Sequence, residues 1–291
     1  MQITQRQSRL LFIAVLPLFL GSGFASLVLD SSIIGDIIGT SQGYSLIDLI
    51  IQTIISTVMG TLIVLAMFFT LKRRGDTAKK LMIAFVVSPI LYFVFLFLGQ
   101  AFLLILFKGS SSGGFFQGII SMFSLGIAML SLAMILMDAI PPTVKNLFVA
   151  FYGSVFGIFL GIIFVTATMF VLLISLIFED FLLTRFSPVS QEVTMTGRVG
   201  EDPFDYSRIK TESVAVGVGD FVAFSLLSAH AVVYFPFHVW SMSLILAFVG
   251  ISVNVLVLAR EGEILPGIPL PALLGIIPWI VHIVTLAILG A

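Results

Sequence analysis

Long apolar runs alternate with short polar connections along most of the chain. Nine such runs are present, and each approaches or exceeds the roughly 20 residues that a transmembrane helix needs. They extend approximately over residues 9–29, 45–71, 81–107, 115–137, 144–164, 167–184, 214–236, 239–259 and 270–289. Lipid offers no partner for unpaired backbone groups, and the runs are too long for barrel strands, so each is predicted to be a helix. The pattern predicts an all-α membrane protein with nine transmembrane helices.

The composition agrees with this pattern and excludes several classes of protein. Hydrophobic residues make up 59% of the 291 residues and charged residues only 10%, with a mean hydropathy of +1.20. Soluble domains carry about 25% charged residues, so most of this chain is expected to face lipid. The net charge of -1 gives no general attraction to nucleic acid. Because the chain has no cysteine, disulfides, thiolate metal sites and a cysteine nucleophile are excluded.

The distribution of basic residues predicts how the helices are oriented. Cytoplasmic loops of membrane proteins carry an excess of Lys and Arg. If the N-terminus is cytoplasmic, nine spans place all 14 basic residues except Lys108 in cytoplasmic segments. The first outer connection instead carries Asp30 and Asp36. We therefore expect a multi-pass protein of the cell membrane, with its N-terminus in the cytoplasm and its C-terminus outside.

The first apolar run has a second interpretation. Arg6 and Arg9 precede the run from Leu10 to Leu20, and small residues follow at positions 21–26, as in a secretory signal with its cleavage site. The apolar stretch continues to Leu29, which is close to the length of a full span. We expect a first transmembrane helix that is retained.

The polar stretch between the sixth and seventh runs divides the chain. Residues 1–185 hold helices 1–6, residues 186–213 form a cytoplasmic polar loop, and residues 214–291 hold helices 7–9, all within a single membrane domain. Within the loop, residues 192–196 and 205–209 are rich in β-branched or aromatic residues and are separated by glycine and proline. This composition predicts a small β-hairpin between helices 6 and 7, with a disordered connector as the alternative.

Five acidic residues lie in or beside the predicted spans. Ionisable groups at membrane depth are costly and are usually functional. The five residues are Asp48, Asp138, Glu179, Asp180 and Asp220. Asp48 lies near the outer end of the second span and Asp138 at the inner end of the fourth, so both are interpreted as hydrated helix ends.

Asp180 and Asp220 differ from the others because they reach the same depth. Asp180 lies five residues before Arg185, roughly 8 Å inside the cytoplasmic boundary, and Asp220 lies seven residues after Ser213, roughly 10 Å inside it. Neither span contains a basic partner. Two carboxyl groups in an apolar site cannot both ionise cheaply, so one holds a proton. Such a pair can activate water with one group and protonate a carbonyl oxygen with the other.

Two backbone motifs accompany these acids. The segment Gly217–Asp220 reads Gly-Val-Gly-Asp, and its glycines allow another backbone to approach closely. The segment Gly267–Leu273 contains Pro269 and Pro271, which remove backbone donors and keep the preceding residues out of a helix. Each motif also has an ordinary reading, because small residues are common in membrane helices and proline often starts a helix.

Together, an acid ending the sixth span, Gly-x-Gly-Asp in the seventh and Pro-Ala-Leu opening the ninth resemble the presenilin and signal-peptide-peptidase family of intramembrane aspartyl proteases. The chain is similar to an archaeal member. The resemblance covers the nine-span architecture, but its specific motifs lie only between Glu179 and Leu273. It implies that Asp180 and Asp220 are catalytic, that transmembrane helices of other proteins are the substrates, and that no cofactor or metal takes part. The residues that it assigns to shaping the site and receiving substrate are Gly217, Gly219, Pro271, Ala272 and Leu273.

The chain departs from the family pattern at one position. The family's first acid usually follows a tyrosine, whereas Glu179 precedes Asp180 here, which makes Glu179 a candidate substitute for or modulator of Asp180. The predicted orientation is similar to that of presenilins, which implies substrates with their N-terminus outside. We expect an unwound substrate segment to pair, strand to strand, with the loop near Val193 or Tyr206.

Other functions remain open from the sequence. Membrane acids without basic partners also serve as proton relays, so a proton-coupled transporter or channel is one alternative, and a catalytically silent membrane scaffold is another. Prepilin-type peptidases also carry Gly-x-Gly-Asp, but no lysine follows Asp220 here. His230, His238 and His282 are scattered, so no metal site is expected. Asn254 is interpreted as an interhelical hydrogen-bonding residue.

Overall fold

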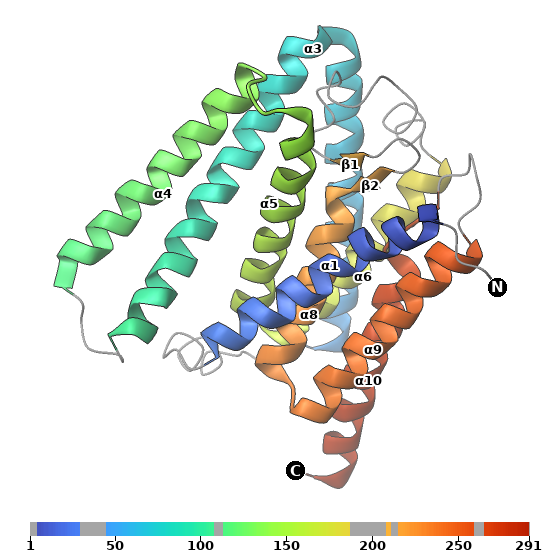
Figure 1. The fold of residues 1–291 in the computed structure, drawn as a ribbon. Helices are drawn as coiled ribbons and strands as arrows, with labels where there is room; N and C mark the ends of the chain where they lie inside the picture. Colours follow the sequence, from blue (N-terminus) through green and yellow to red (C-terminus); the bar gives the residue numbers. More distant parts are fainter. Residues whose placement is uncertain are drawn as a thin grey trace.

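The computed structural model describes residues 5–29, 45–107, 113–186, 208–210, 215–258 and 265–290. Helices dominate these ranges, and one two-stranded sheet accompanies them (Figure 1). In chain order the elements are α1 (Gln5–Val28), α3 (Leu46–Leu106), α4 (Gly113–Leu136), α5 (Pro142–Ile163), α6 (Thr166–Phe186), β1 (Arg208–Lys210), β2 (Ala215–Gly217), α8 (Val218–Tyr234), α9 (Phe237–Val253), the π-helical turn η2 (Asn254–Leu258) and α10 (Pro269–Leu289).

The lengths and compositions of the helices are those of a membrane protein. Seven helical segments in the described part of the chain are long and apolar enough to cross a membrane, and two apolar helices, Leu46–Leu62 and Val218–Tyr234, are shorter. Large apolar side chains are exposed along most of these helices, as expected where lipid is the solvent. The predicted all-α, multi-pass membrane fold is therefore confirmed, and the orientation of its termini stays a prediction.

The second and third predicted spans form one continuous helix. The sequence analysis placed a polar connection between residues 71 and 81, but α3 runs without interruption for 61 residues. Figure 1 shows that this helix changes direction near the top of the view, so that its two apolar arms descend separately. The connecting stretch is rich in Lys and Arg, which are good helix formers, and this explains why it keeps helical hydrogen bonds.

The predicted helix boundaries around α5 agree with the structure. Pro141 precedes α5 with φ -58° and ψ 145°, and Pro142 occupies the first turn, where its missing N–H costs nothing. The chain leaves the helix at Phe164, which is extended, and α6 begins at Thr166. The nearly fused fifth and sixth apolar runs are therefore separate helices, as the sequence predicted.

Helix α8, which carries Asp220, is largely enclosed by its neighbours. It packs against α1 and α5, and its side chains from Phe221 to Val233 are almost all buried. Glycines on the neighbouring helices make this close packing possible: a Cβ built on Gly161 of α5 would lie 2.6 Å from the backbone oxygen of Leu226. On its other side, α8 joins an apolar cluster around Trp279 of α10. Its position is thus fixed by backbone contacts as well as by side chains.

A short β-hairpin leads directly into α8. Strands β1 and β2 pair antiparallel, with Ile209 opposite Val216, and both side chains are buried in a cluster that includes Val149 of α5. The predicted hairpin differs from this one. Its first strand, residues 192–196, lies outside the described residues, and its second, 205–209, overlaps β1 only at its end. The partner strand is Ala215–Gly217, so α8 begins at Val218 and not at residue 214, because β-branched residues beside a span cannot be told from the span by hydropathy.

Candidate functional site

Asp180 is held between its own helix and the segment that precedes α10. Its Oδ2 accepts a hydrogen bond from the backbone N–H of Ile268 at 2.9 Å, and its Oδ1 accepts one from Thr184 Oγ1 at 3.4 Å. Thr184 lies one turn further along α6, whereas Ile268 is 88 residues away in the sequence. The carboxyl group of Asp180 therefore links the C-terminal end of α6 to the segment that precedes α10.

Asp220 lies in the first turn of α8, three residues after β2 ends at Gly217. An acidic residue is favoured at this position because it faces the positive end of the helix dipole. The carboxyl group packs against the bare Cα of Gly267: a Cβ built there would lie 2.5 Å from Asp220 Oδ1 and 3.0 Å from Oδ2. Only glycine fits at position 267 without displacing the carboxyl group.

The two acids thus converge on the same two residues. Asp180 bonds the N–H of Ile268, and Asp220 contacts the Cα of Gly267, the residue immediately before it. Both carboxyl groups therefore lie against the Gly267–Ile268 peptide. Residues 265–268 are not helical, and α10 begins only at Pro269. The structure therefore brings the two acids that the sequence placed at equal depth to the non-helical residues 265–268. Of the segment Gly267–Leu273 that was predicted to be irregular, residues 269–273 instead form the first turn of α10, which is the ordinary reading of proline at a helix start.

Glu179 points elsewhere. Its carboxyl group lies against Gly60 of α3, where an added Cβ would overlap it. Consecutive residues on a helix differ by about 100° in direction, so Glu179 and Asp180 face different neighbours. Glu179 contributes to the packing of α6 on α3 and takes no part in the contact between Asp180 and Ile268.

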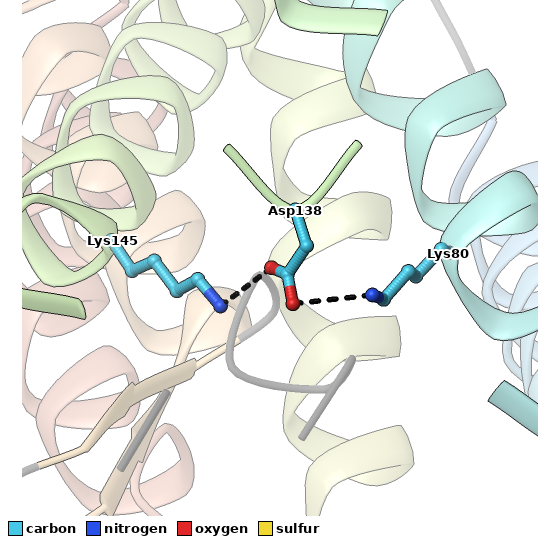
Figure 2. A network of polar contacts seen from close by, with 3 residues as sticks. All are labelled: Lys80, Asp138 and Lys145. Carbon is cyan, nitrogen blue, oxygen red and sulfur yellow. Dashed lines mark hydrogen bonds and ion pairs between the residues drawn. The ribbon is translucent and has the colours of Figure 1, made fainter. Parts of the chain in front are cut away.

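Asp138 forms ion pairs with two lysines, as Figure 2 shows. Its Oδ1 lies 2.8 Å from Lys145 Nζ and its Oδ2 lies 3.1 Å from Lys80 Nζ. Lys145 comes from α5 and Lys80 from α3, while Asp138 lies in the turn after α4 with a left-handed φ of 52°. These ion pairs join three helices and give Asp138 a structural explanation. Its placement at the end of the fourth span agrees with the sequence analysis.

Asp48 and His230 also have local structural explanations. Ser45 and Asp48 form a capping pair at the start of α3: Ser45 Oγ donates to Asp48 Oδ2 at 2.7 Å and accepts from the Asp48 N–H at 3.1 Å. Fully buried His230 contacts the backbone oxygen of Gly161 at 2.9 Å through Nδ1 and Thr166 Oγ1 at 3.2 Å through Nε2. Among the residues that the structure describes, no three His, Asp or Glu side chains form a group suited to a metal ion.

The residues assigned to substrate binding by resemblance lie around the acids, with unequal exposure. Gly217 is exposed at the end of β2, and a Cβ built on Gly219 would come no nearer than 4.0 Å to Ile268 Cδ1. Pro271 and Ala272 are buried in the first turn of α10, where the Cα of Pro271 would lie 2.6 Å from a Cβ on Gly250 of α9. Leu273 is 53% exposed. The glycines and Leu273 are the accessible members of this set.

The sequence analysis did not anticipate three contributors to the site. Thr184 donates a hydrogen bond to Asp180 from one turn away, and this spacing of four residues could have been recognised in the sequence. Ile268 contributes only its backbone N–H, which cannot be predicted from a pattern of side chains. Asn254 was interpreted as an interhelical hydrogen-bonding residue; its Nδ2 does donate a hydrogen bond, at 2.9 Å, but the acceptor is the oxygen of Gly267 in the non-helical segment before α10. Its proximity to the acids was not predicted.

The arrangement can perform acid–base chemistry. Two carboxyl groups that adjoin the same peptide can share one proton, so that one group acts as a base and the other as an acid. Comparisons with known proteins give no further guidance, since no family model, no curated protein and no solved structure matches the chain.

Proposed function

We propose that this protein is an intramembrane aspartyl protease, which hydrolyses peptide bonds in transmembrane segments of membrane-protein substrates with Asp180 and Asp220 as its catalytic pair. The observation that carries the proposal is the convergence of both carboxyl groups on Gly267 and Ile268. Within the described residues, Asp138 is held by two ion pairs, whereas no ion pair is seen for Asp180 or Asp220. The resemblance to the presenilin and signal-peptide-peptidase family, stated above on the sequence motifs, points to the same pair.

The reaction requires one ionised and one protonated carboxyl group. The ionised group accepts a proton from water while the water oxygen attacks the carbonyl carbon, and the protonated group donates its proton to the carbonyl oxygen. The resulting tetrahedral diol then collapses: the C–N bond breaks, the amine takes a proton from one acid, and a hydroxyl proton returns to the other. Atoms and charges balance without a cofactor or metal, and each acid exchanges its role once per cycle.

The substrate must unwind before this chemistry, because the carbonyls of a membrane helix are hydrogen-bonded and shielded. Hairpin β1–β2 ends three residues before Asp220, so a substrate strand added to a hairpin edge would run toward the acids. The exposed Gly217 and the open space beside Gly219 leave room for a second backbone there. The sequence predicted that this pairing occurs near Val193 or Tyr206, and both residues lie outside the described residues. In the present proposal the substrate strand pairs instead with the hairpin beside Asp220.

The direct test is cleavage by purified protein. We would add a single-span substrate in detergent and follow products by mass spectrometry for the parent chain, Asp180→Asn, Asp220→Asn and Asp138→Asn, each first checked for folding. The proposal expects both members of the pair to be essential and Asp138→Asn to cut at the parent position. A parent chain that cuts no substrate in several lipids would overturn the proposal and direct attention to proton flux.

A further inference from the structure

Asn254 occupies an unusual turn beside the site. It begins η2, the π-helical turn that follows α9, and it is only 6% exposed. π-helical turns insert an extra residue into a helix and are frequent at functional sites. The side-chain nitrogen of Asn254 donates to the backbone oxygen of Gly267 at 2.9 Å. A buried amide in this position links the cytoplasmic end of α9 to the irregular segment before α10.

The acceptor of this bond and the donor to Asp180 belong to one peptide unit. The oxygen of Gly267 receives the Asn254 bond, and the N–H of Ile268, at the other end of the same peptide, donates to Asp180 Oδ2 at 2.9 Å. The peptide is planar and rigid, so fixing its carbonyl also fixes the direction of its N–H. A hydrogen bond to the carbonyl also polarises the unit and strengthens the bond donated by the N–H.

The same peptide unit also sets the position of Asp220. The Cα of Gly267 belongs to the peptide plane and packs against the Asp220 carboxyl group. A rotation of the peptide would therefore disturb Asp180 through its hydrogen bond and Asp220 through its packing. No alternative donor follows immediately, because residue 269 is a proline and has no N–H.

We propose that Asn254 is a positioning residue for the aspartyl site: by holding the carbonyl of Gly267, it aims the Ile268 N–H at Asp180 and keeps the Gly267 Cα against Asp220. This inference rests on the proposed function, and it adds a residue that neither the motifs nor the resemblance assigns. Asn254 acts through the peptide and does not touch the substrate, so the term catalytic is kept for the two acids.

A simple tether between helices is the competing explanation, and the chain offers a matched control for it. Ser243 of α9 is fully buried and donates to the oxygen of Gly275 in α10 at 2.6 Å, in a bond of the same kind three turns away from Asn254. Ser243→Ala removes a tether between the same two helices without altering the Gly267–Ile268 peptide. Asn254 and Ser243 variants should therefore differ if positioning is the role of Asn254.

The kinetic test compares Asn254→Leu, which has a similar volume and no donor, with Asn254→Ala, Asn254→Gln and Ser243→Ala. We expect kcat to fall about 10- to 100-fold in the Leu and Ala variants with KM changed less than about twofold, because the reacting groups are misplaced while substrate binding is not. Asn254→Gln keeps a donor and should recover part of kcat. Equal losses in Asn254→Leu and Ser243→Ala would overturn the positioning role.

A second test needs no activity. Protein labelled with ¹³C at glycine carbonyls and ¹⁵N at isoleucine gives NMR signals only from Gly–Ile peptides, and the Ile268 signal is assigned by its disappearance in Ile268→Val. We expect this signal to move in both Asn254→Leu and Asp180→Asn, and to stay in place in Ser243→Ala. An unmoved signal in folded Asn254→Leu and Asn254→Ala contradicts the inference. If the signal moves in Asn254→Leu and Asp180→Asn but the parent chain cuts no substrate, the role of Asn254 in holding the peptide stands and the proposed protease function is rejected.

Discussion

The carboxyl group of Asp220 rests on the Cα of Gly267, at a distance that leaves no room for a side chain at position 267. Gly267→Ala would place a methyl carbon 2.5 Å from Asp220 Oδ1, so the carboxyl group must move. We expect cleavage to fall about 100-fold or more, since small displacements of reacting groups have effects of this size. Product formation by mass spectrometry measures the loss.

Gly118→Ala is the matched control for this substitution, because a Cβ at position 118 meets nothing within 4 Å. Both variants should retain helical circular dichroism, and Gly118→Ala should cut at the parental rate. Parental cleavage by Gly267→Ala would mean that Asp220 does not work from the position seen here.

Substitutions at Glu179 and Asp180 distinguish the contributions of these two neighbouring acids to cleavage. The carboxyl group of Glu179 packs on Gly60 of α3 and not on the Gly267–Ile268 peptide. Glu179→Gln keeps the shape of the side chain, so we expect cleavage within about threefold of the parent, whereas Asp180→Asn should abolish it. Matched initial rates on one substrate test this. Complete loss in folded Glu179→Gln would assign the acid role to Glu179 instead.

The ion pairs of Asp138 are predicted to matter for stability. The side chain of Lys145 is only 4% exposed, and removing the partner of a buried charge costs roughly 3–5 kcal/mol. Because Asp138 itself is 31% exposed, we expect Asp138→Asn to lose about 2 kcal/mol, or roughly 4–8 °C in Tm. Thermal unfolding in detergent measures the change.

Lys80 provides the comparison for this prediction. It pairs with the same carboxylate but is 25% exposed, so Lys80→Met should cost less than about 1 kcal/mol. If Lys80→Met proved as damaging as Asp138→Asn, the burial of Lys145 would not be the source of the effect.

The absence of cysteine makes the predicted orientation directly testable. Single cysteines at Thr77, whose side chain is exposed on α3, and at Ser110, in the predicted outer connection, should react with a membrane-impermeant maleimide from opposite sides. With a cytoplasmic N-terminus, intact cells should label Ser110→Cys at once and Thr77→Cys only after permeabilisation. The reverse pattern would invert the predicted topology and the expected orientation of substrates.

The sequence predicted those features that depend on hydropathy and on position along a helix. Counting residues from the predicted cytoplasmic boundary placed Asp180 and Asp220 at similar depth, and both carboxyl groups do lie beside Gly267 and Ile268. Proline and glycine marked the start of α5 and the irregular segment before α10. These predictions succeeded because membrane thickness and backbone chemistry act locally.

The features that were missed depend on contacts between distant residues or between backbone groups. The hydrogen bond from Ile268 to Asp180 joins positions 88 residues apart and uses an N–H that every residue except proline possesses. The register of Ile209 with Val216 was missed because strand β2 continues the apolar run of α8. Nothing in the residues 71–81 distinguished a polar loop from a polar helix, and α3 is helical throughout.

The tight packing of α8 holds Asp220 more firmly than α6 holds Asp180. Asp220 is anchored to a helix that glycines such as Gly161 allow to sit backbone to backbone against its neighbours, so it has little freedom to shift along or around its axis. Asp180 lies on α6, whose C-terminal part exposes Phe178, Phe181 and Phe186. If the protein is the protease proposed above, we expect α6 and residues 265–268 to move when a substrate strand enters, while α8 and Asp220 keep their positions.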